Sequence, residues 1–361
     1  MQVEDLVALD EYSLRHEDKE AILTERLREL TLLHRDRCEP YRRILSGLGH
    51  DAEHITSTAR APMLPVGLFK SHELRSIAAD DVSKVVTSSG TTGEAVSHVY
   101  LDAAAARLQT RCLAGIMTHW LGPARLPMVI VDARSTVRDR HTRSARAAGI
   151  VGMSTFGRDH LYALDDAMRL DRARLVSWLH EHEGSPILVF GFTFMVWEYV
   201  LGAVAPGEIN LQDATLIHSG GWKRLADRAV TNRDFKTELQ RVTGLRRVHN
   251  FYGMAEQIGT VLVECEHGYL HTPNAAELIV RDPATWEVAA DGEVGLAQTL
   301  SALPESYPGH SIITEDLARV DAVDSCPCGR LGKAVSILGR APEAEPRGCS
   351  DTSSEPAGLV A

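Results

Sequence analysis

The chain has 361 residues, of which 44% are hydrophobic and 24% charged, and its net charge is −11. This acidic balance argues against a nucleic-acid-binding surface, which would be basic. No apolar run approaches the roughly 20 residues that a membrane span needs, and the acidic N-terminal segment lacks the features of a signal peptide. We therefore expect a cytoplasmic protein with no nucleic-acid partner, whose six cysteines are reduced thiols or metal ligands.

Hydrophobic periodicity predicts an α/β protein. Apolar residues at helical spacing predict a helix over residues 19–37, and Pro62–Lys70 is expected to be an extended connection. Asp102 can cap a helix that runs to about Trp120. Strands and helices then alternate, which predicts parallel sheets covered by helices. The predicted strands are Met128–Val131, Ile187–Phe190, Ala214–His218 and Arg246–Asn250, and the helices are Thr136–Ala148, Arg172–Glu183, Phe194–Leu201 and Leu225–Val242.

The pattern changes after about Val261 to short strands such as Glu277–Val280 and Gly295–Leu300, interrupted by Gly, Pro and Asp. These strands predict an antiparallel or barrel-like subdomain. The sequence beyond Arg340 is rich in Pro, Ser and Glu and is expected to be flexible. We therefore divide the chain into an α/β part with an N-terminal helical segment over residues 1–260, a β-rich subdomain over 261–340 and a tail over 341–361.

The most informative stretch is the hexapeptide Ser88-Ser89-Gly90-Thr91-Thr92-Gly93, which follows a strand that is predicted to end at Thr87. Two glycines allow a tight backbone turn, and the hydroxyl and N–H groups suit the acceptor oxygens of a triphosphate. It is not a Walker loop, because no Gly-x-x-x-x-Gly-Lys-Ser/Thr occurs. By itself the hexapeptide fits a phosphate loop and an ordinary surface loop equally well.

Further motifs follow it in a fixed order. Residues 219–223 (Ser-Gly-Gly-Trp-Lys) and 250–256 (Asn-Phe-Tyr-Gly-Met-Ala-Glu) each follow a predicted parallel strand. Residues 314–317 (Thr-Glu-Asp-Leu) and 338–340 (Leu-Gly-Arg) lie in the β-rich region. Loops beyond the carboxyl ends of parallel strands build the ligand crevice in open α/β sheets.

In order and spacing these motifs resemble the adenylate-forming superfamily of acyl-CoA synthetases, adenylation domains and luciferases. The chain is most similar to the LuxE-like acyl-protein synthetases, a likeness supported by Gly-Gly-Trp-Lys, by Leu68-Phe69-Lys70 and by residues 347–350 (Arg-Gly-Cys-Ser). The resemblance implies the large N-terminal domain of that superfamily, in which parallel sheets and helices join a small β-barrel-like subdomain. It also implies ATP and Mg²⁺ as cofactors.

The resemblance further implies roles for single residues. Residues Ser88 to Gly93 would wrap the phosphates, and Glu256 would ligate Mg²⁺, which prefers hard oxygen donors. Asp316 would accept hydrogen bonds from the ribose hydroxyls, and Arg340 would contact the ribose or a phosphate. The adenine would be bordered by Gly220 and Gly221 and stacked near Tyr252, which Gly253 follows.

The chain departs from the superfamily pattern in four places. The phosphate loop continues with Glu94-Ala95-Val96, where the pattern has Pro-Lys. Ala255 replaces the hydroxyl residue before the glutamate, and Glu315 replaces a glycine before the aspartate. The sequence also stops soon after Arg340, so we expect the small C-terminal domain and its lysine to be absent. Positive charge for the developing phosphate would then come from Lys223, Lys70, Arg340 or a partner protein.

A second constellation points to a metal. Cys265, His271, Cys326 and Cys328 offer three thiolates and one imidazole, a closed set suited to structural zinc. His267 is an alternative imidazole, and scattered reduced cysteines are the alternative to a metal site. Members of the superfamily similar to phenylacetate-CoA ligase carry a comparable Cys-x-Cys-Gly-Arg.

The remaining cysteines divide into two kinds. Cys38 and Cys112 lie in helical patterns and are expected to be packing residues. Cys349 lies in the tail beside Arg347, which favours the thiolate. The resemblance implies that it carries an acyl group in covalent catalysis, and an exposed, idle cysteine is the equal alternative.

We therefore predict an ATP- and Mg²⁺-dependent ligase that activates a fatty or aryl carboxylic acid as acyl-AMP and transfers the acyl group to a thiol. The acceptor would be Cys349, a carrier protein or a partner such as a reductase. The alternatives are a ligase that uses coenzyme A, a carrier protein or an amine, and a nucleotide-binding protein with weak catalysis. The apolar segment Phe190–Trp197 lines the acid's pocket or belongs to the core.

Overall fold

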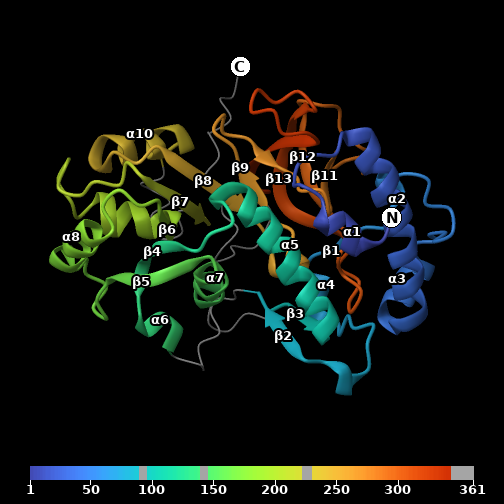
Figure 1. Ribbon diagram of the computed structural model, residues 1–361. Helices are drawn as coiled ribbons and strands as arrows, with labels where there is room; N and C mark the ends of the chain where they lie inside the picture. The colour runs from blue at the N-terminus through green and yellow to red at the C-terminus, as the bar shows by residue number, and fades with distance from the viewer. Residues whose placement is uncertain (89–95, 139–144, 222–229, 343–361) are drawn as a thin grey trace. The chain divides into compact units, whose positions relative to one another are not determined.

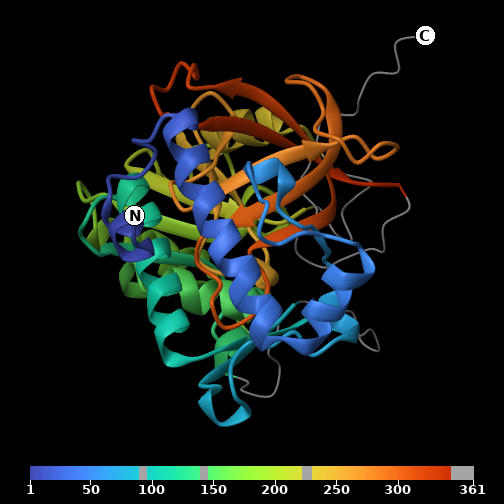
Figure 2. The same cartoon turned by 90° about the vertical axis from the view of Figure 1, so that its right-hand side faces the viewer.

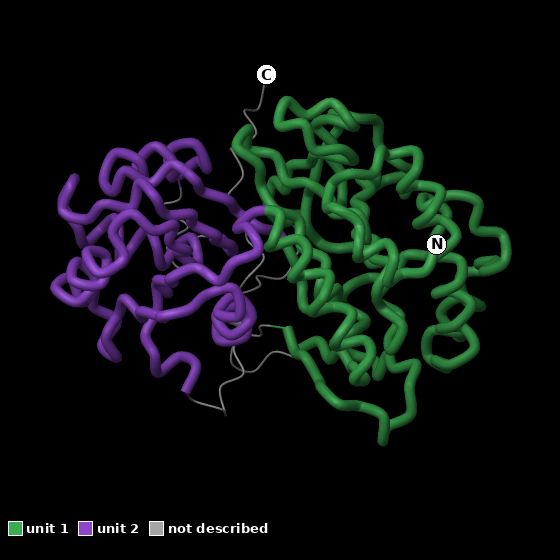
Figure 3. Tube along the Cα trace, viewed as in Figure 1, with its two compact units in different colours: residues 1–119, 253–346 green, residues 120–252, 347–361 purple. Residues whose placement is uncertain are grey.

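The computed structural model describes residues 1–88, 96–138, 145–221 and 230–342. These residues form two compact units, one made of residues 1–119 and 253–342 and the other of residues 120–252 (Figure 3). We call them unit 1 and unit 2. Within the described residues, no helix combines the length and the apolar character needed to cross a membrane.

Unit 2 is built on a parallel sheet with the strand order β8-β7-β6-β4-β5 (Figure 1). All residues of β6 and β7 are buried, as expected for strands covered on both faces. The strands are β4 (Leu126–Ala133), β5 (Gly157–Leu164), β6 (Ile187–Phe192), β7 (Ala214–Ser219) and β8 (Arg247–Tyr252). The helices between them are α6 (Ser135–Arg138), α7 (Ala145–Ser154), α8 (Arg172–Glu181), α9 (Thr193–Val196), the π-helical turn η3 (Trp197–Leu201) and α10 (Asn232–Thr243).

The predicted alternation of strands and helices is confirmed in unit 2, with one omission. Strand β5 was not predicted, because its residues 158–160 are exposed and polar and give no apolar run. The helix expected at Thr136–Ala148 is described only as α6 and the start of α7, since residues 139–144 lie outside the described chain. Residues 222–229 lie outside it as well. Among the described residues, the helix expected over Leu225–Val242 begins only at Asn232, because the side chain of Thr231 caps it by accepting a hydrogen bond from Asp234 N.

Unit 1 contains an antiparallel sheet in the order β11-β12-β13-β14-β10-β9. Strand β13 has 13 residues and is much longer than the short strands expected there. Strand β1 pairs with it in parallel, where the sequence predicted only an extended connection. The strands are β1 (Leu64–Pro65), β2 (Lys84–Thr87), β3 (His98–Leu101), β9 (Leu262–Glu264), β10 (Leu270–His271), β11 (Ala276–Arg281), β12 (Val294–Ser301), β13 (Ser311–Val323) and β14 (Lys333–Arg340).

The N-terminal helices belong to the same unit as these strands. Helix α2 lies across them in Figure 2 and buries Leu27 against Ile279 and Leu300. The buried ammonium of Lys19 donates to Thr272 Oγ1 at 2.7 Å and lies 3.5 Å from the carboxylate of Glu277. The helical segments of unit 1 are α1 (Val3–Ala8), α2 (His16–Arg37), α3 (Glu39–Gly47), η1 (Thr58–Arg60), α4 (Leu68–Ser71), η2 (Ala79–Asp81), α5 (Ala103–Leu121, whose last two residues belong to unit 2) and η5 (Ala255–Gln257).

Candidate metal centre and nucleotide-binding motifs

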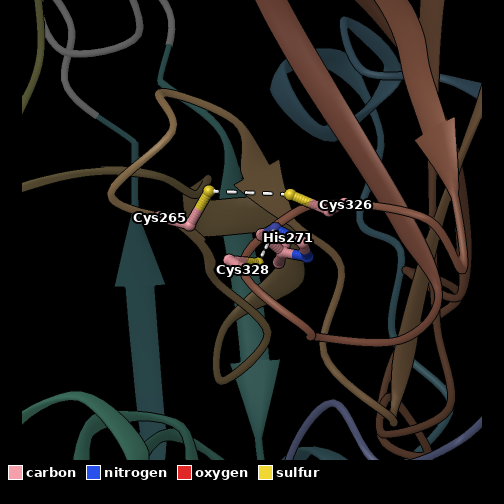
Figure 4. A group of neighbouring side chains, drawn as sticks. All are labelled: Cys265, His271, Cys326 and Cys328. Carbon is pink, nitrogen blue, oxygen red and sulfur yellow. Dashed lines mark hydrogen bonds between the residues drawn. The ribbon is translucent and has the colours of Figure 1, made fainter.

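Three thiols and one imidazole meet in unit 1, where the sequence predicted a metal site (Figure 4). The ligand atoms of Cys265, His271, Cys326 and Cys328 all lie within 4.8 Å of one another. Cys265 Sγ is 3.9 Å from Cys326 Sγ, and Cys328 Sγ is 3.2 Å from His271 Nε2. A tetrahedral zinc ion with bonds of about 2.0–2.3 Å separates its ligands by about 3.5–3.8 Å, so the cluster has the right size.

Local backbone structure explains how the four side chains converge. Cys265 follows β9, His271 lies on β10, and the other two cysteines lie in the turn between β13 and β14. The pairing of His271 with Val263 and Ala334 places β10 between β9 and β14. The turn closes through a hydrogen bond of 3.0 Å from Gly329 N to Cys326 O, and the positive φ of Gly329 (81°) suits a residue without a side chain.

Burial and charge set the protonation of the cluster. Burial lowers the pKa of His271 to about 4, so its imidazole is neutral near pH 7, as a zinc ligand must be. Burial raises the pKa of Cys326 to about 12. Burial opposes ionisation of Cys328 too, but hydrogen bonds from Arg330 bring the pKa of this thiol below its usual value. A divalent cation would favour the thiolate form of all three cysteines.

The structure distinguishes the two candidate imidazoles. His271 is fully buried beside the thiols, whereas His267 is exposed and lies outside the cluster. The four side chains that the structure brings together are therefore those named from the sequence, three thiols and one imidazole. No fifth Cys, His, Asp or Glu belongs to this cluster among the residues that the structure describes. Its composition and spacing fit a structural zinc ion.

The phosphate-loop candidate connects two strands of a hairpin. Strands β2 and β3 pair in an antiparallel manner, which confirms the strand predicted before Ser88. Ser88 N donates to Ser97 O at 3.2 Å, and Ser97 N donates to Ser88 Oγ at 2.9 Å. These bonds close the base of the loop, whose residues 89–95 lie outside the described chain.

The boundary between the two units falls inside the motif of residues 250–256, after Tyr252. Tyr252 ends β8 and is 3% exposed. Glu256 lies in the single turn η5 of unit 1 and is 2% exposed. Its Oε1 atom is buried without a hydrogen-bond partner among the described residues, and an unpartnered carboxylate oxygen is a suitable ligand for Mg²⁺.

The motifs of residues 314–317 and 338–340 face each other in unit 1. Asp316 on β13 is the register partner of Arg340 on β14, and both are largely buried. Arg340 Nη2 forms an ion pair with Glu315, while its Nε and Nη1 atoms are buried and have no hydrogen-bond partner in the described chain. Two free guanidinium donors beside a carboxylate fit a ligand that carries both hydroxyls and an anionic group.

The other predicted residues are placed as follows. Gly220 and Gly221 come directly after β7, at its carboxyl end, and both are buried. Lys223 and Cys349 lie outside the described residues. Cys112 is buried on α5, and Cys38 is buried at the junction of α2 and α3. The segment Phe190–Trp197 forms the end of β6 and the helix after it, as predicted.

Comparisons with solved structures identify the fold as that of adenylate-forming ligases. The chain is similar to 2-hydroxyisobutyryl-CoA ligase in its postadenylation state with 2-HIB-AMP (TM-score 0.67, 17% identity, 91% of this chain and 69% of that chain). It is also similar to an open conformation of that ligase with 2-HIB-AMP and CoA (TM-score 0.68, 17% identity, 92% of this chain and 77% of that chain). The predicted α/β fold of adenylate-forming enzymes is thus confirmed, and the expected absence of the small C-terminal domain stays a prediction.

The sequence assigns the chain to a smaller group of proteins than the fold does. The acyl-protein synthetase family LuxE matches residues 1–357, and the chain belongs to this family. A curated relative is the long-chain-fatty-acid–luciferin-component ligase of Aliivibrio fischeri, which is 23% identical over 378 residues, with 97% of this chain and 92% of the relative aligned. The chain is accordingly a ligase that activates an acid with ATP and transfers the acyl group.

Proposed function

We propose that this protein converts a fatty or aryl carboxylic acid and ATP into acyl-AMP and then passes the acyl group to a protein thiol. The observation that carries the proposal is the pairing of Asp316 with Arg340 at the end of a hairpin, in a chain of the acyl-protein synthetase family. The name of the relative from Aliivibrio fischeri supports a fatty acid as the substrate.

Unit 1 supplies three of the proposed contacts to ATP. Asp316 accepts hydrogen bonds from the ribose hydroxyls, and the free Nε and Nη1 donors of Arg340 bind the ribose or a phosphate oxygen. Glu256 offers its unpartnered Oε1 to Mg²⁺. When bound, Mg²⁺ would neutralise charge on the phosphate oxygens.

The remaining contacts are proposed from the motifs. Residues Ser88 to Gly93 donate hydroxyl and backbone N–H groups to the phosphates. The backbone of Gly220 and Gly221 borders the adenine, and Tyr252, followed by Gly253, lies near its plane. Lys223 supplies a further positive charge to the phosphates.

The proposed chemistry has two balanced steps. A carboxylate oxygen of the acid attacks the α-phosphorus of ATP, and pyrophosphate leaves with the electron pair of the broken P–O bond. A thiolate then attacks the acyl carbonyl, a thioester forms and AMP leaves. We propose Cys349 as this nucleophile, from which a reductase or a carrier protein takes the acyl group. The cytoplasm, where ATP is available and thiols stay reduced, suits this chemistry.

We further propose that Cys265, His271, Cys326 and Cys328 hold a structural zinc ion. Three cysteines and one histidine at these distances match the ligand type, number and spacing of structural zinc sites. The ion would fasten the β13–β14 turn to β9 and β10. Because β13 and β14 also carry Asp316 and Arg340, the zinc site would hold the strands that form the nucleotide contacts.

The proposal is tested with purified protein, ATP, Mg²⁺ and a panel of fatty, aryl and amino acids, with pyrophosphate release as the readout. We expect release with one class of acid and, by intact mass, an acylated chain. Replacement of Cys349 by serine should abolish the hydroxylamine-labile acyl label and leave acyl-AMP formation intact. Absence of pyrophosphate with every acid would refute the activity. Turnover that requires added coenzyme A or an amine would refute the thiol acceptor within the chain.

A further inference from the structure

Glu256 lies in a short turn that has few hydrogen bonds of its own. It belongs to η5, a single 3₁₀ turn of three residues with extended backbone on either side. The side chain is buried, and Oε1 has no hydrogen-bond partner among the described residues. A turn this short does not hold its own geometry, because few backbone bonds stabilise it. Its position must therefore come from contacts with neighbouring segments.

The next residue, Gln257, supplies those contacts. Its side chain is 4% exposed, and its Nε2 atom donates to Thr299 O and to Gly309 O, each at 2.9 Å. Thr299 lies on β12, and Gly309 lies just before β13. Both hydrogens of one buried amide thus join the turn to strand β12 and to the segment that precedes β13. Strand β13, which follows that segment, carries Asp316, the proposed ribose-binding residue.

Gly309 packs closely against the turn of Glu256. A Cβ atom at Gly309 would lie 2.7 Å from Glu256 O and 2.2 Å from Cε2 of Tyr307. Tyr307 is itself fully buried and contacts Phe69 edge to face. The backbone of residues 307–309 therefore forms a close-fitting surface under Glu256, and Gln257 fastens the turn to that surface.

We propose that Gln257 is a positioning residue that holds the carboxylate of Glu256 in place for the divalent cation of bound ATP. The inference rests on the proposed function, since it takes Glu256 as the cation ligand. An amide suits this task because its two N–H groups satisfy two buried carbonyl oxygens without adding charge beside the carboxylate. Leucine at this position would fill a similar volume but would remove both of these hydrogen bonds and leave the turn without its tether.

The test measures cation binding rather than turnover. The protein is titrated with Mn²⁺ in the presence of an ATP analogue that cannot be cleaved between the α- and β-phosphates, and the loss of the electron paramagnetic resonance signal of free Mn²⁺ is recorded. Positioning contacts to metal ligands typically change affinity by tenfold or more, so Gln257→Leu should raise the half-saturating Mn²⁺ concentration roughly tenfold. Gln257→Asn keeps the amide on a shorter side chain, and we expect it to raise the half-saturating Mn²⁺ concentration about threefold. The asparagine variant provides the test if the leucine variant does not fold.

Gln298 provides the matched control. It is a fully buried glutamine of the same unit, which accepts from Arg281 Nε at 2.8 Å and donates to Ser311 Oγ at 2.9 Å. Gln298→Leu should leave Mn²⁺ binding unchanged even where it lowers the melting temperature. If the Gln257 variants bind Mn²⁺ like the wild type, or if Gln298→Leu weakens binding equally, the positioning role is refuted. If the wild type retains no Mn²⁺ with the analogue, the proposed cation site of Glu256 fails instead.

Discussion

Arg340 forms an ion pair with Glu315, the residue directly before its register partner Asp316. The resemblance described above implies a glycine at this place, so Glu315 is a carboxylate that the pattern does not include, beside the proposed nucleotide contacts. Glu315 pairs with Nη2 of Arg340, while Nε and Nη1 have no hydrogen-bond partner among the described residues. At the proposed site, the negative charge of Glu315 would oppose the binding of ATP, and its ion pair engages one donor of the guanidinium group.

We therefore predict that Glu315→Gln lowers the KM for ATP. Ion pairs with this degree of exposure contribute up to about 1 kcal/mol, so the decrease should be about two- to fivefold. Arg340→Gln should raise the KM for ATP, because it removes the donors themselves. Steady-state kinetics at a saturating concentration of the acid measures both changes.

Glu305→Gln is the control for this prediction. Glu305 also pairs with an arginine of unit 1, Arg26, and its replacement makes the same change in charge. We expect this variant to bind ATP like the wild type. An unchanged or higher KM for ATP in Glu315→Gln would show that the carboxylate does not compete with the nucleotide for Arg340.

The second prediction concerns the metal. Protein purified without chelators should contain one equivalent of zinc, and Cys326→Ser should lose most of it, because a tetrahedral site tolerates the loss of a thiolate poorly. The loss should also lower the melting temperature of unit 1, by about 2–4 °C for each kcal/mol of stability lost. Elemental analysis and calorimetry provide the two measurements.

Cys112→Ala is the control for this prediction, because it removes a buried thiol that is not a proposed zinc ligand. Cys112 is as buried as Cys265 but lies on α5, outside the cluster. The Cys112→Ala variant should keep its zinc, and it should lose some stability because the smaller side chain leaves a small cavity. Zinc-free protein that melts at the same temperature as the zinc-loaded protein would contradict a structural role for the ion.

A buried acid of unit 1 predicts how stability depends on pH. Burial raises the pKa of Glu11 from 4.5 to about 7, although Asn274 N donates to its carboxylate at 3.1 Å and Lys19 lies nearby. The folded state therefore binds a proton more tightly than the unfolded state. The contribution of protonated Glu11 to the free energy of unfolding is fully present below about pH 4.5. It is lost as the pH rises through 7, by up to roughly 3 kcal/mol.

Glu11→Gln keeps an acceptor for Asn274 N and removes the titration. Its free energy of unfolding should match that of the wild type near pH 4.5 and exceed it at pH 8. Urea denaturation at several pH values measures the difference. Glu17 is exposed on α2, and Glu17→Gln should follow the pH profile of the wild type. A profile of Glu11→Gln parallel to that of the wild type would contradict the raised pKa.

The sequence predicted best the strands that are buried along their whole length. β6 and β7 are buried along their whole length and were predicted nearly to the residue. β5 begins with exposed polar residues, and β13 alternates buried residues with charged ones, so neither shows a continuous apolar run. The sequence also did not predict that α2 packs on the β-rich region, because Lys19 and Thr272 are 253 residues apart.

The candidate site was likewise predicted only in part from the sequence. The spacing of the cysteines and histidines in the sequence was enough to predict that Cys265, His271, Cys326 and Cys328 lie together. The sequence favoured His271 and kept His267 as the alternative, and the structure places only His271 in the cluster. The tether of Gln257 to Thr299 and Gly309 and the pair of Arg340 with Glu315 also required the structure, since glutamine and glutamate occur commonly without such partners.

The central claim is that the protein forms an acyl-adenylate. Its most direct test is to mix the protein with ATP, Mg²⁺ and the panel of acids without any acceptor, to quench with acid and to identify the products by mass spectrometry. In the Cys349→Ser variant, which lacks the proposed acceptor thiol, we expect acyl-AMP and pyrophosphate in equal amounts, and a strong reduction of both when Glu256→Gln is added. Formation of ADP and phosphate, or acyl transfer without a detectable adenylate when Cys349 is replaced, would contradict it.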